Sequence, residues 1–310
     1  MDGKIHTLRG PIEPLLLGNT YAHEHLLWSP PQPYAAEDPD LVLNNVQAAE
    51  KELENFVRSG GQSLVEMTTT ELQRAPEDLL ALSEKSGVNI IAATGYNKSK
   101  FSEKFTASKT HTELVREMLE DLTRGMEGTK IRAGVIKAAS SRDKMTAGEK
   151  KVFQAAAEAH LQTGAPLSTH TEAGTLALEQ ISLLTSLGVR PERILIGHLD
   201  RKLDEDYLLE VAKSGVMLGF DQIGKEKYYP DKERITMIKK LVKAGFQKQI
   251  LLSGDMARRS SWPAYGFGKG PGLTFILWRF IPWLISSGVP VQTARQILTD
   301  NPAAFLAWGK

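Results

Sequence analysis

The chain has 310 residues, a formal net charge of +1, 41% hydrophobic and 24% charged residues, and no cysteine. A charge this close to neutral gives no electrostatic basis for binding nucleic acid or an anionic membrane, and the lack of cysteine excludes disulfides, thiolate nucleophiles and cysteine-ligated zinc. No stretch reaches the ~18 apolar residues of a membrane-spanning helix, and the N-terminal residues carry no secretory signal. We therefore expect a cytoplasmic protein with no nucleic-acid or membrane partner.

Short apolar runs alternate with amphipathic stretches along the whole chain. The predicted strands are 20–26, 63–68, 88–94, 131–137, 167–170, 193–198, 216–220 and 249–255. The predicted helices are 40–59, 78–86, 112–125, 148–163, 174–187, 204–214, 231–244, 274–287 and 291–298, with a loop over 95–109. Eight strands that alternate with helices indicate a parallel sheet.

Eight such units in about 250 residues fit a closed (β/α)8 TIM barrel. An open doubly wound sheet is the alternative, but no Gly-x-Gly-x-x-Gly follows the first strand, which weakens it. No composition break marks a linker, so we expect a single α/β domain over residues 1–310.

Two histidines lie two residues apart in the first predicted strand, in the segment YAHEHL. Side chains at positions i and i+2 of a strand point to the same face, so His23 and His25 would converge on one spot. The spacing suits two ligands of one cation. The alternative is a pair of hydrogen-bonded histidines at the end of a strand.

Four later strands end in side chains that can take part in metal chemistry: Lys137, His170, His198 and Asp255. These are the carboxyl ends of the strands, where barrel enzymes place their active sites. Imidazole suits zinc-like ions and a carboxylate supplies a hard oxygen ligand. Any one of these histidines could be a buried hydrogen-bonded group, but the set together predicts a metal centre.

Lys137 is the unusual member, because an ammonium group cannot bind a cation. Burial and nearby positive charge lower the pKa of a lysine. The neutral amine can then react with carbon dioxide to form a carbamate, whose two oxygens can bridge two ions. The alternative is a lysine whose amine extends to the rim of the barrel.

Five segments in order, YAHEHL, AGVIKAAS, STHTEAG, IGHLD and LLSGD, resemble the phosphotriesterase-like family of the amidohydrolase superfamily. The resemblance extends over nearly the whole chain. It implies an amidohydrolase-type barrel with two divalent metal ions, usually zinc. The implied ligands are His23, His25 and Asp255 for the buried ion, His170 and His198 for the exposed ion, and a carbamate on Lys137 shared by both.

The same resemblance implies a hydrolase in which the metal pair generates hydroxide at neutral pH and Asp255 accepts its proton. The segments IGKEKYYPD and SGDMARRS are similar to the subgroup that opens sugar (furanose) lactones bearing a phosphate. That similarity implies phosphate contacts from Lys227 and Arg258. Ser261 stands where the subgroup has a tyrosine. Tyr96 is a candidate contact to the substrate carbonyl, or else a packed aromatic at the rim.

Three alternatives to a phosphorylated sugar lactonase remain. An organophosphate triesterase would carry an acid at the position of Arg201, and an acyl-homoserine lactonase would need an apolar channel that the sequence does not show. The third alternative is a non-catalytic metal-binding barrel, because the fold hosts many roles. The family resemblance and the apolar helix over 275–285 suggest a homodimer.

Overall fold

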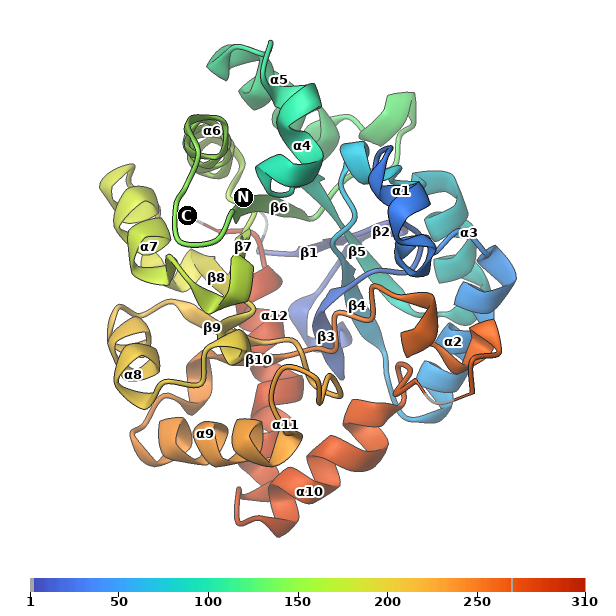
Figure 1. Cartoon of the computed structure of the whole chain (residues 1–310), viewed down its shortest axis with the longest axis vertical. Coiled ribbons are helices and arrows are strands. Elements are labelled where there is room, and N and C mark those ends of the chain that lie inside the picture. Colours follow the sequence, from blue (N-terminus) through green and yellow to red (C-terminus); the bar gives the residue numbers. More distant parts are fainter. Residues whose placement is uncertain (1–2, 269, 310) are drawn as a thin grey trace.

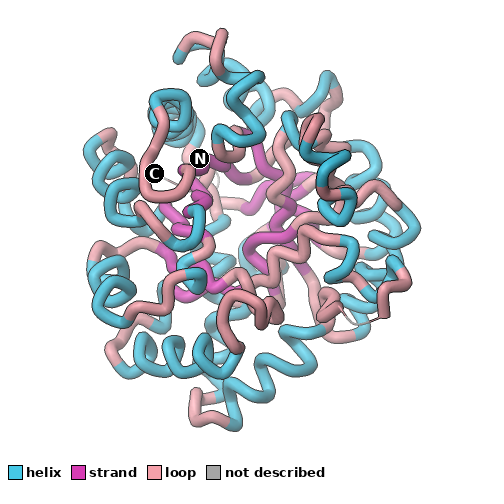
Figure 2. The backbone as a smooth tube through the Cα atoms, viewed as in Figure 1, coloured by secondary structure: helices cyan, strands magenta, loops and turns pink. Residues whose placement is uncertain are grey.

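The computed structural model describes residues 3–268 and 270–309. Its centre is an eight-stranded parallel sheet that curves into a barrel, surrounded by helices (Figures 1 and 2). The strands pair in chain order: β3 (Thr20–Glu24), β4 (Ser63–Glu66), β5 (Asn89–Gly95), β6 (Val135–Ser140), β7 (Leu167–Thr171), β8 (Ile194–Gly197), β9 (Met217–Phe220) and β10 (Ile250–Leu252). The predicted (β/α)8 barrel is thus confirmed.

The first and last strands meet through a seam of polar contacts. The backbone N–H of His23 donates to Ser253 Oγ at 3.0 Å, and the N–H of Asp255 donates to the carbonyl of His23 at 3.2 Å. These bonds bring the two ends of the sheet together. They also place two predicted metal ligands, one from each end of the sheet, side by side.

The helices pack around the barrel (Figure 1), most of them as an outer layer and α12 (Asp300–Leu306) against β10. They are α1 (Tyr34–Glu37), α2 (Val46–Arg58), α3 (Pro76–Ser86), α4 (Ser99–Thr106), α5 (His111–Thr123), α6 (Ala147–Thr163), α7 (Ala177–Ser186), α8 (Glu205–Lys213), α9 (Asp231–Lys243), α10 (Ile281–Ser286), α11 (Val291–Leu298) and α12 (Asp300–Leu306). A π-helical turn, Ile276–Phe280, leads into α10. No helix in the described ranges is long and apolar enough to cross a membrane.

An antiparallel hairpin of β1 (Ile5–Thr7) and β2 (Gly10–Ile12) precedes the barrel. The N–H of Leu8 donates to the carbonyl of Ile90, near the start of β5, so the hairpin lies at the amino ends of the strands. His6 stacks on Trp308 with ring centres 3.8 Å apart. The opposite end of the barrel is therefore left for the candidate site.

The buried apolar side chains form two groups. One lies inside the barrel and includes Ala22, Val65, Ile91, Val135 and Leu251. The larger group fills the space between the sheet and the helices. This alternation within each strand follows from the two-residue period of a strand, which sends successive side chains to opposite faces.

The structure differs from the predicted elements in several places; β6, for example, spans Val135–Ser140 rather than residues 131–137. The helix expected from residue 40 begins at Val46, because the side chain of Asn45 accepts the N–H of Ala48 and caps the helix there. The loop expected over 95–109 contains α4. The helix has few apolar residues, so the apolar spacing that would predict a helix is weak. The chain also ends in a further helix, α12, because Pro302 lies in its first turn, where a proline is tolerated.

Candidate metal centre

The two histidines of the first barrel strand lie at an irregularity in its pairing. The register between β3 and β4 shifts between Tyr21 and Glu24, which is the behaviour of a β-bulge. The bulge departs from strict alternation, and both His23 and His25 line the central cavity. The predicted convergence is therefore present, although β3 itself ends at Glu24.

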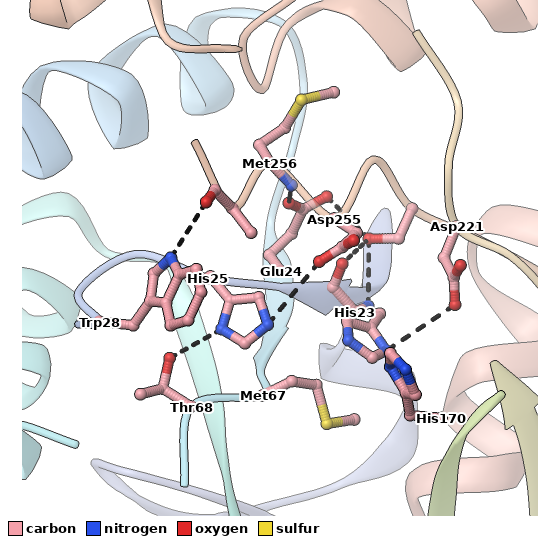
Figure 3. A network of polar contacts seen from close by, with 12 residues as sticks. His23, Glu24, His25, Trp28, Met67, Thr68, His170, Asp221, Asp255 and Met256 are labelled. Atoms are coloured by element: carbon pink, nitrogen blue, oxygen red, sulfur yellow. Dashed lines mark hydrogen bonds and ion pairs between the residues drawn. The ribbon is translucent and has the colours of Figure 1, made fainter. Parts of the chain in front are cut away.

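Glu24, between the two histidines, holds the segment after β10. Its carboxylate accepts the backbone N–H group of Gly254 at 2.7 Å and that of Met256 at 2.8 Å; Figure 3 shows the contact with Met256. Asp255 between them adopts a left-handed backbone with φ of 44°. These two bonds fix a backbone conformation that a non-glycine residue rarely adopts, and they place Asp255 beside the histidines.

One group of ligand atoms comes from His23, His25 and Asp255 and lies within 4.8 Å of one another. His25 Nε2 is 3.7 Å from Asp255 Oδ1, and its Nδ1 contacts Thr68 Oγ1 at 2.8 Å (Figure 3). Thr68 thus engages one ring nitrogen of His25 and leaves the other directed to the cluster. His23 Nδ1 is buried and has no hydrogen-bond partner among the described residues.

The second group is built from β7 and β8. His170 lies in β7, and His198 directly follows β8 with φ of 60°. Nδ1 of His170 and Nε2 of His198 face each other at 2.7 Å. Asp221, which follows β9, engages Nδ1 of His198 at 2.6 Å. Nε2 of His198 is therefore the atom presented to the cluster.

Lys137 lies in the middle of β6, not at the end of a strand as the sequence predicted. Its side chain reaches the same cavity as the histidines. The residue is 1% exposed, and Nζ donates to the carbonyl of Met67 at 2.9 Å. Burial lowers the pKa of Lys137 to about 8, against the opposing effect of Asp255 and other carboxylates. The amine is therefore more readily neutral than that of a surface lysine.

Burial sets the protonation of most of the histidines. It lowers the pKa of His23 and His25 well below the usual value, and that of His170 to about 3. These imidazoles are neutral at neutral pH, which is the form that binds metal. In His198 burial also acts to lower the pKa, but the carboxylate of Asp221 outweighs it and the pKa is raised.

All six predicted ligands thus line one cavity: His23, His25, Lys137, His170, His198 and Asp255. Neutral buried imidazoles, a ring nitrogen of His23 with no hydrogen bond to any described residue, and a carboxylate form a donor set that suits zinc-like ions. A neutral lysine amine among them has the chemistry needed for carbamate formation. The residues present therefore fit a divalent metal centre.

The cavity has a volume of about 460 Å³ and opens at the carboxyl ends of the strands. Lys225, in the loop after β9, reaches Asp255 Oδ2 at 2.8 Å, and Gln222 Nε2 donates to the same oxygen at 2.8 Å. Burial acts to raise the pKa of Asp255, but Lys225 and the histidines outweigh it and hold the pKa well below its usual range. Asp255 is therefore ionised at neutral pH.

Of the three predicted substrate contacts, two line this cavity and one does not. Lys227 and Arg258 line the cavity, but the guanidinium of Arg258 forms ion pairs with Asp38 at 2.9 Å and Asp40 at 3.1 Å. Tyr96 does not line this cavity: its hydroxyl donates to Glu117 at 2.7 Å, and it lines a separate cavity beside α5.

Sequence reasoning passed over Asp221, Gln222 and Lys225. Asp221 and Gln222 directly follow the seventh barrel strand, so the rule that flagged the other strand ends would have found them. Lys225 lies in a loop with two other charged residues nearby, and nothing in its spacing distinguishes it from them. Its contact with Asp255 joins positions 30 residues apart.

Comparison with known proteins agrees with this geometry. Residues 3–306 match the model of the phosphotriesterase family. The phosphotriesterase homology protein of Escherichia coli is 36% identical over 93% of this chain and 97% of its own, and its crystal structure, complexed with phosphate in the active site, superimposes with a TM-score of 0.89 over 94% of this chain and 99% of that one.

Two further relatives are lactonases by name. The phospho-furanose lactonase of Mycoplasmopsis synoviae is 34% identical over 99% of this chain and 93% of its own. The lactonase from Listeria monocytogenes is 34% identical, with a TM-score of 0.93 over 99% of this chain and 100% of that one. The family resemblance predicted from the five segments is confirmed: the chain belongs to the phosphotriesterase family and is a hydrolytic enzyme.

Proposed function

We propose that this protein is a binuclear metal-dependent lactonase that opens a phosphorylated sugar lactone, most simply a furanose lactone. The observation that carries the proposal is the convergence of four histidines, a buried lysine and an ionised aspartate in one cavity. The phospho-furanose lactonase relative and the phosphate in the Escherichia coli structure support the choice of substrate.

In this proposal His23, His25 and Asp255 would hold one divalent ion, for which zinc suits the ligand set, and His170 and His198 would hold a second, with Lys137 as a carbamate serving both. A metal pair bound there would supply hydroxide at neutral pH and Lewis acidity toward the lactone carbonyl. The depth of Lys137 supports the carbamate, because a cationic ammonium in this position would repel the metals. Asp221 holds His198 in the orientation that a ligand needs.

Side chains of the cavity accept the proton, orient Asp255 and contact the substrate. Asp255 accepts the proton of the attacking water, because its carboxylate is ionised and directed into the site. Lys225 and Gln222 hold Oδ2 of Asp255 and so set which oxygen faces the other ligands. Lys227 lies on the opening of the cavity, where it can contact an anionic substituent of the substrate.

The decisive experiment is a matched substrate panel with the zinc-loaded enzyme, followed by proton release. Each sugar lactone is assayed with and without its phosphate, beside an organophosphate triester and an acyl-homoserine lactone. We expect kcat/KM to be highest for a phosphorylated lactone and to be lost on chelation. A preference for the triester or the acyl lactone would replace this proposal, and hydrolysis of none of them with metal bound would favour a binding protein.

We also propose a homodimer. Trp278 and Trp283, at the surface of the segment that leads into and includes α10, are 58% and 41% exposed. Large exposed apolar side chains on one surface segment are typical of a contact surface. Light scattering of the wild type and of a Trp278→Glu variant tests this: an equal mass for both would contradict a dimer built on this face.

The lack of cysteine supports a cytoplasmic location.

A further inference from the structure

Glu66, the last residue of β4, is a buried carboxylate that lies behind the candidate metal centre and does not line the cavity. The residue is 0% exposed. Its two oxygens have separate partners: Oε2 accepts the backbone N–H of Leu26 at 2.5 Å, and Oε1 accepts that of Thr68 at 3.1 Å. One side chain therefore ties the segment that follows β3 to the segment that follows β4.

Both of these segments contact predicted metal ligands or contain one. The segment after β3 contains His25, whose Nδ1 lies 2.8 Å from Oγ1 of Thr68 and 3.9 Å from Oε1 of Glu66 (Figure 3). The segment after β4 begins with Met67, whose carbonyl accepts Nζ of Lys137 at 2.9 Å. The three residues 66–68 thus contact one ligand of the buried group and the lysine of the cavity.

The hydroxyl of Thr68 connects the carboxylate to the imidazole, because it also hydrogen bonds to the side chain of Glu66. A hydroxyl has a single proton to donate. When Glu66 accepts that proton, the oxygen of Thr68 can only accept from Nδ1 of His25, and the lone pair of the neutral ring then lies on Nε2. Nε2 is the atom 3.7 Å from Oδ1 of Asp255, among the candidate ligand atoms.

The same carboxylate sets the direction of a backbone carbonyl. The N–H of Thr68 and the carbonyl of Met67 belong to one planar trans peptide group, so they point in opposite directions. Since Glu66 binds the N–H, the carbonyl is directed away from Glu66, and there it accepts Nζ of Lys137. A carbamate nitrogen retains one N–H, so this contact suits both the amine and its carbamate.

We infer that Glu66 is a positioning residue of the metal centre, which orients His25 through Thr68 and Lys137 through the carbonyl of Met67. This inference rests on the metal centre of the proposed function. Partners behind a metal ligand fix the orientation and tautomer of that ligand, and their loss lowers metal affinity about 10- to 100-fold.

The test is a competition for zinc between the protein and a chelator. Glu66→Gln keeps the size of the side chain but offers one acceptor oxygen in place of two, and we expect its zinc affinity to fall about 10- to 100-fold. Thr68→Val removes the hydroxyl alone and should also weaken zinc binding. Thr68→Ser keeps the hydroxyl and should retain the zinc affinity of the wild type within about twofold.

Glu52→Gln is the matched control for a purely structural effect. Glu52, on α2, is 1% exposed and does not line the cavity, and its carboxylate accepts the backbone N–H groups of Ala264 at 3.0 Å and Leu273 at 3.3 Å. Each glutamine variant leaves one buried N–H without its acceptor, so both should lower the thermal midpoint of the metal-free protein. Only Glu66→Gln should also lose zinc affinity.

Equal zinc affinities for Glu66→Gln and Glu52→Gln would overturn the inference. If Glu66→Gln does not fold, the two variants of Thr68 decide, and equal zinc affinities for Thr68→Val and Thr68→Ser would overturn it as well.

The lactone panel keeps this inference separate from the proposed activity. If Glu66→Gln loses zinc affinity and Glu52→Gln does not, while the zinc-loaded wild type opens no lactone, the positioning role stands and the lactonase proposal fails. If the wild type opens phosphorylated lactones and Glu66→Gln keeps its zinc affinity, the lactonase proposal stands and the positioning role is wrong.

Discussion

Arg234, on α9, is completely buried and joins two buried carboxylates. Nε donates to Asp200 at 2.8 Å and Nη1 to Asp231 at 2.9 Å, and all three side chains are 0% exposed. The two carboxylates also accept the backbone N–H groups of Gln222 at 2.9 Å and Gly224 at 3.1 Å. The arginine therefore anchors the start of the loop that carries the cavity's lysines.

Replacement of Arg234 by Met keeps much of the volume and leaves both carboxylates without their cation. Loss of one partner of a buried ion pair costs about 3–5 kcal/mol in the free energy of unfolding. With an unfolding entropy of about 2.1 cal/mol/K per residue, this cost lowers the thermal midpoint of a chain of this length by about 5–8 °C. We also expect kcat/KM to fall, because the loop loses its anchor.

The loss should depend on pH in a defined direction. Burial raises the pKa of Asp200 to about 6 and raises that of Asp231, even with the arginine present. Without it, both folded pKa values rise further above the unfolded value of about 3.9. The folded variant then binds protons that the unfolded chain does not, so its destabilisation should shrink as the pH falls from about 8 to about 5.

Calorimetry of the metal-free protein in chelator at both pH values measures these shifts without a contribution from metal binding. The control is Lys240→Met, which breaks a surface pair with Glu205 whose side chains are 46% and 45% exposed; it should cost less than about 1 kcal/mol. A midpoint for Arg234→Met within about 1–2 °C of the wild type at pH 8 would refute the reasoning. A loss equally large at pH 5 would show that the carboxylates are not its cause.

Three further changes test the metal centre. Lys137→Ala should lose both bound metals and activity, with partial rescue by short carboxylates; full metal content by elemental analysis would end the carbamate proposal. Asp221→Asn removes the charge that holds His198 and should weaken metal binding about 10- to 100-fold in a chelator competition; unchanged affinity would contradict that role. Glu24→Gln leaves one buried backbone N–H unpaired and should cost about 1–3 kcal/mol. Because burial raises the pKa of Glu24 to about 7, this carboxyl makes the wild type less stable as pH rises through 4.5–7, and calorimetry of Glu24→Gln should lack that slope.

Much of the architecture could be predicted from local pattern. The predicted strands correspond to the eight barrel strands because each is a short apolar run between turn or helix signals, and parallel strands need a helix between them. Helix α4 was missed because it has few apolar positions, and the residues that it buries, Ser102 and Thr106, are polar. The start of α2 depended on a capping bond of Asn45 that the hydrophobic spacing does not reveal.

The candidate metal ligands were found for a related reason. They lie at or near the carboxyl ends of strands, and a barrel brings all such ends to one rim, so position along the chain implies position in space. The exception is Lys137, whose strand continues for three residues beyond it. Its side chain reaches the cavity from within the strand, which the sequence could not distinguish from a strand end.

Sequence alone therefore determined the barrel, the family and the groups that surround the cavity, because these depend on periodicity and on motifs of a few residues. Tertiary structure decided which charges are paired: Arg258 forms ion pairs with Asp38 and Asp40 from a loop some 220 positions away. The physical reason is that the effective charge of a side chain depends on the partners that folding brings within a few ångströms, and no local pattern specifies them.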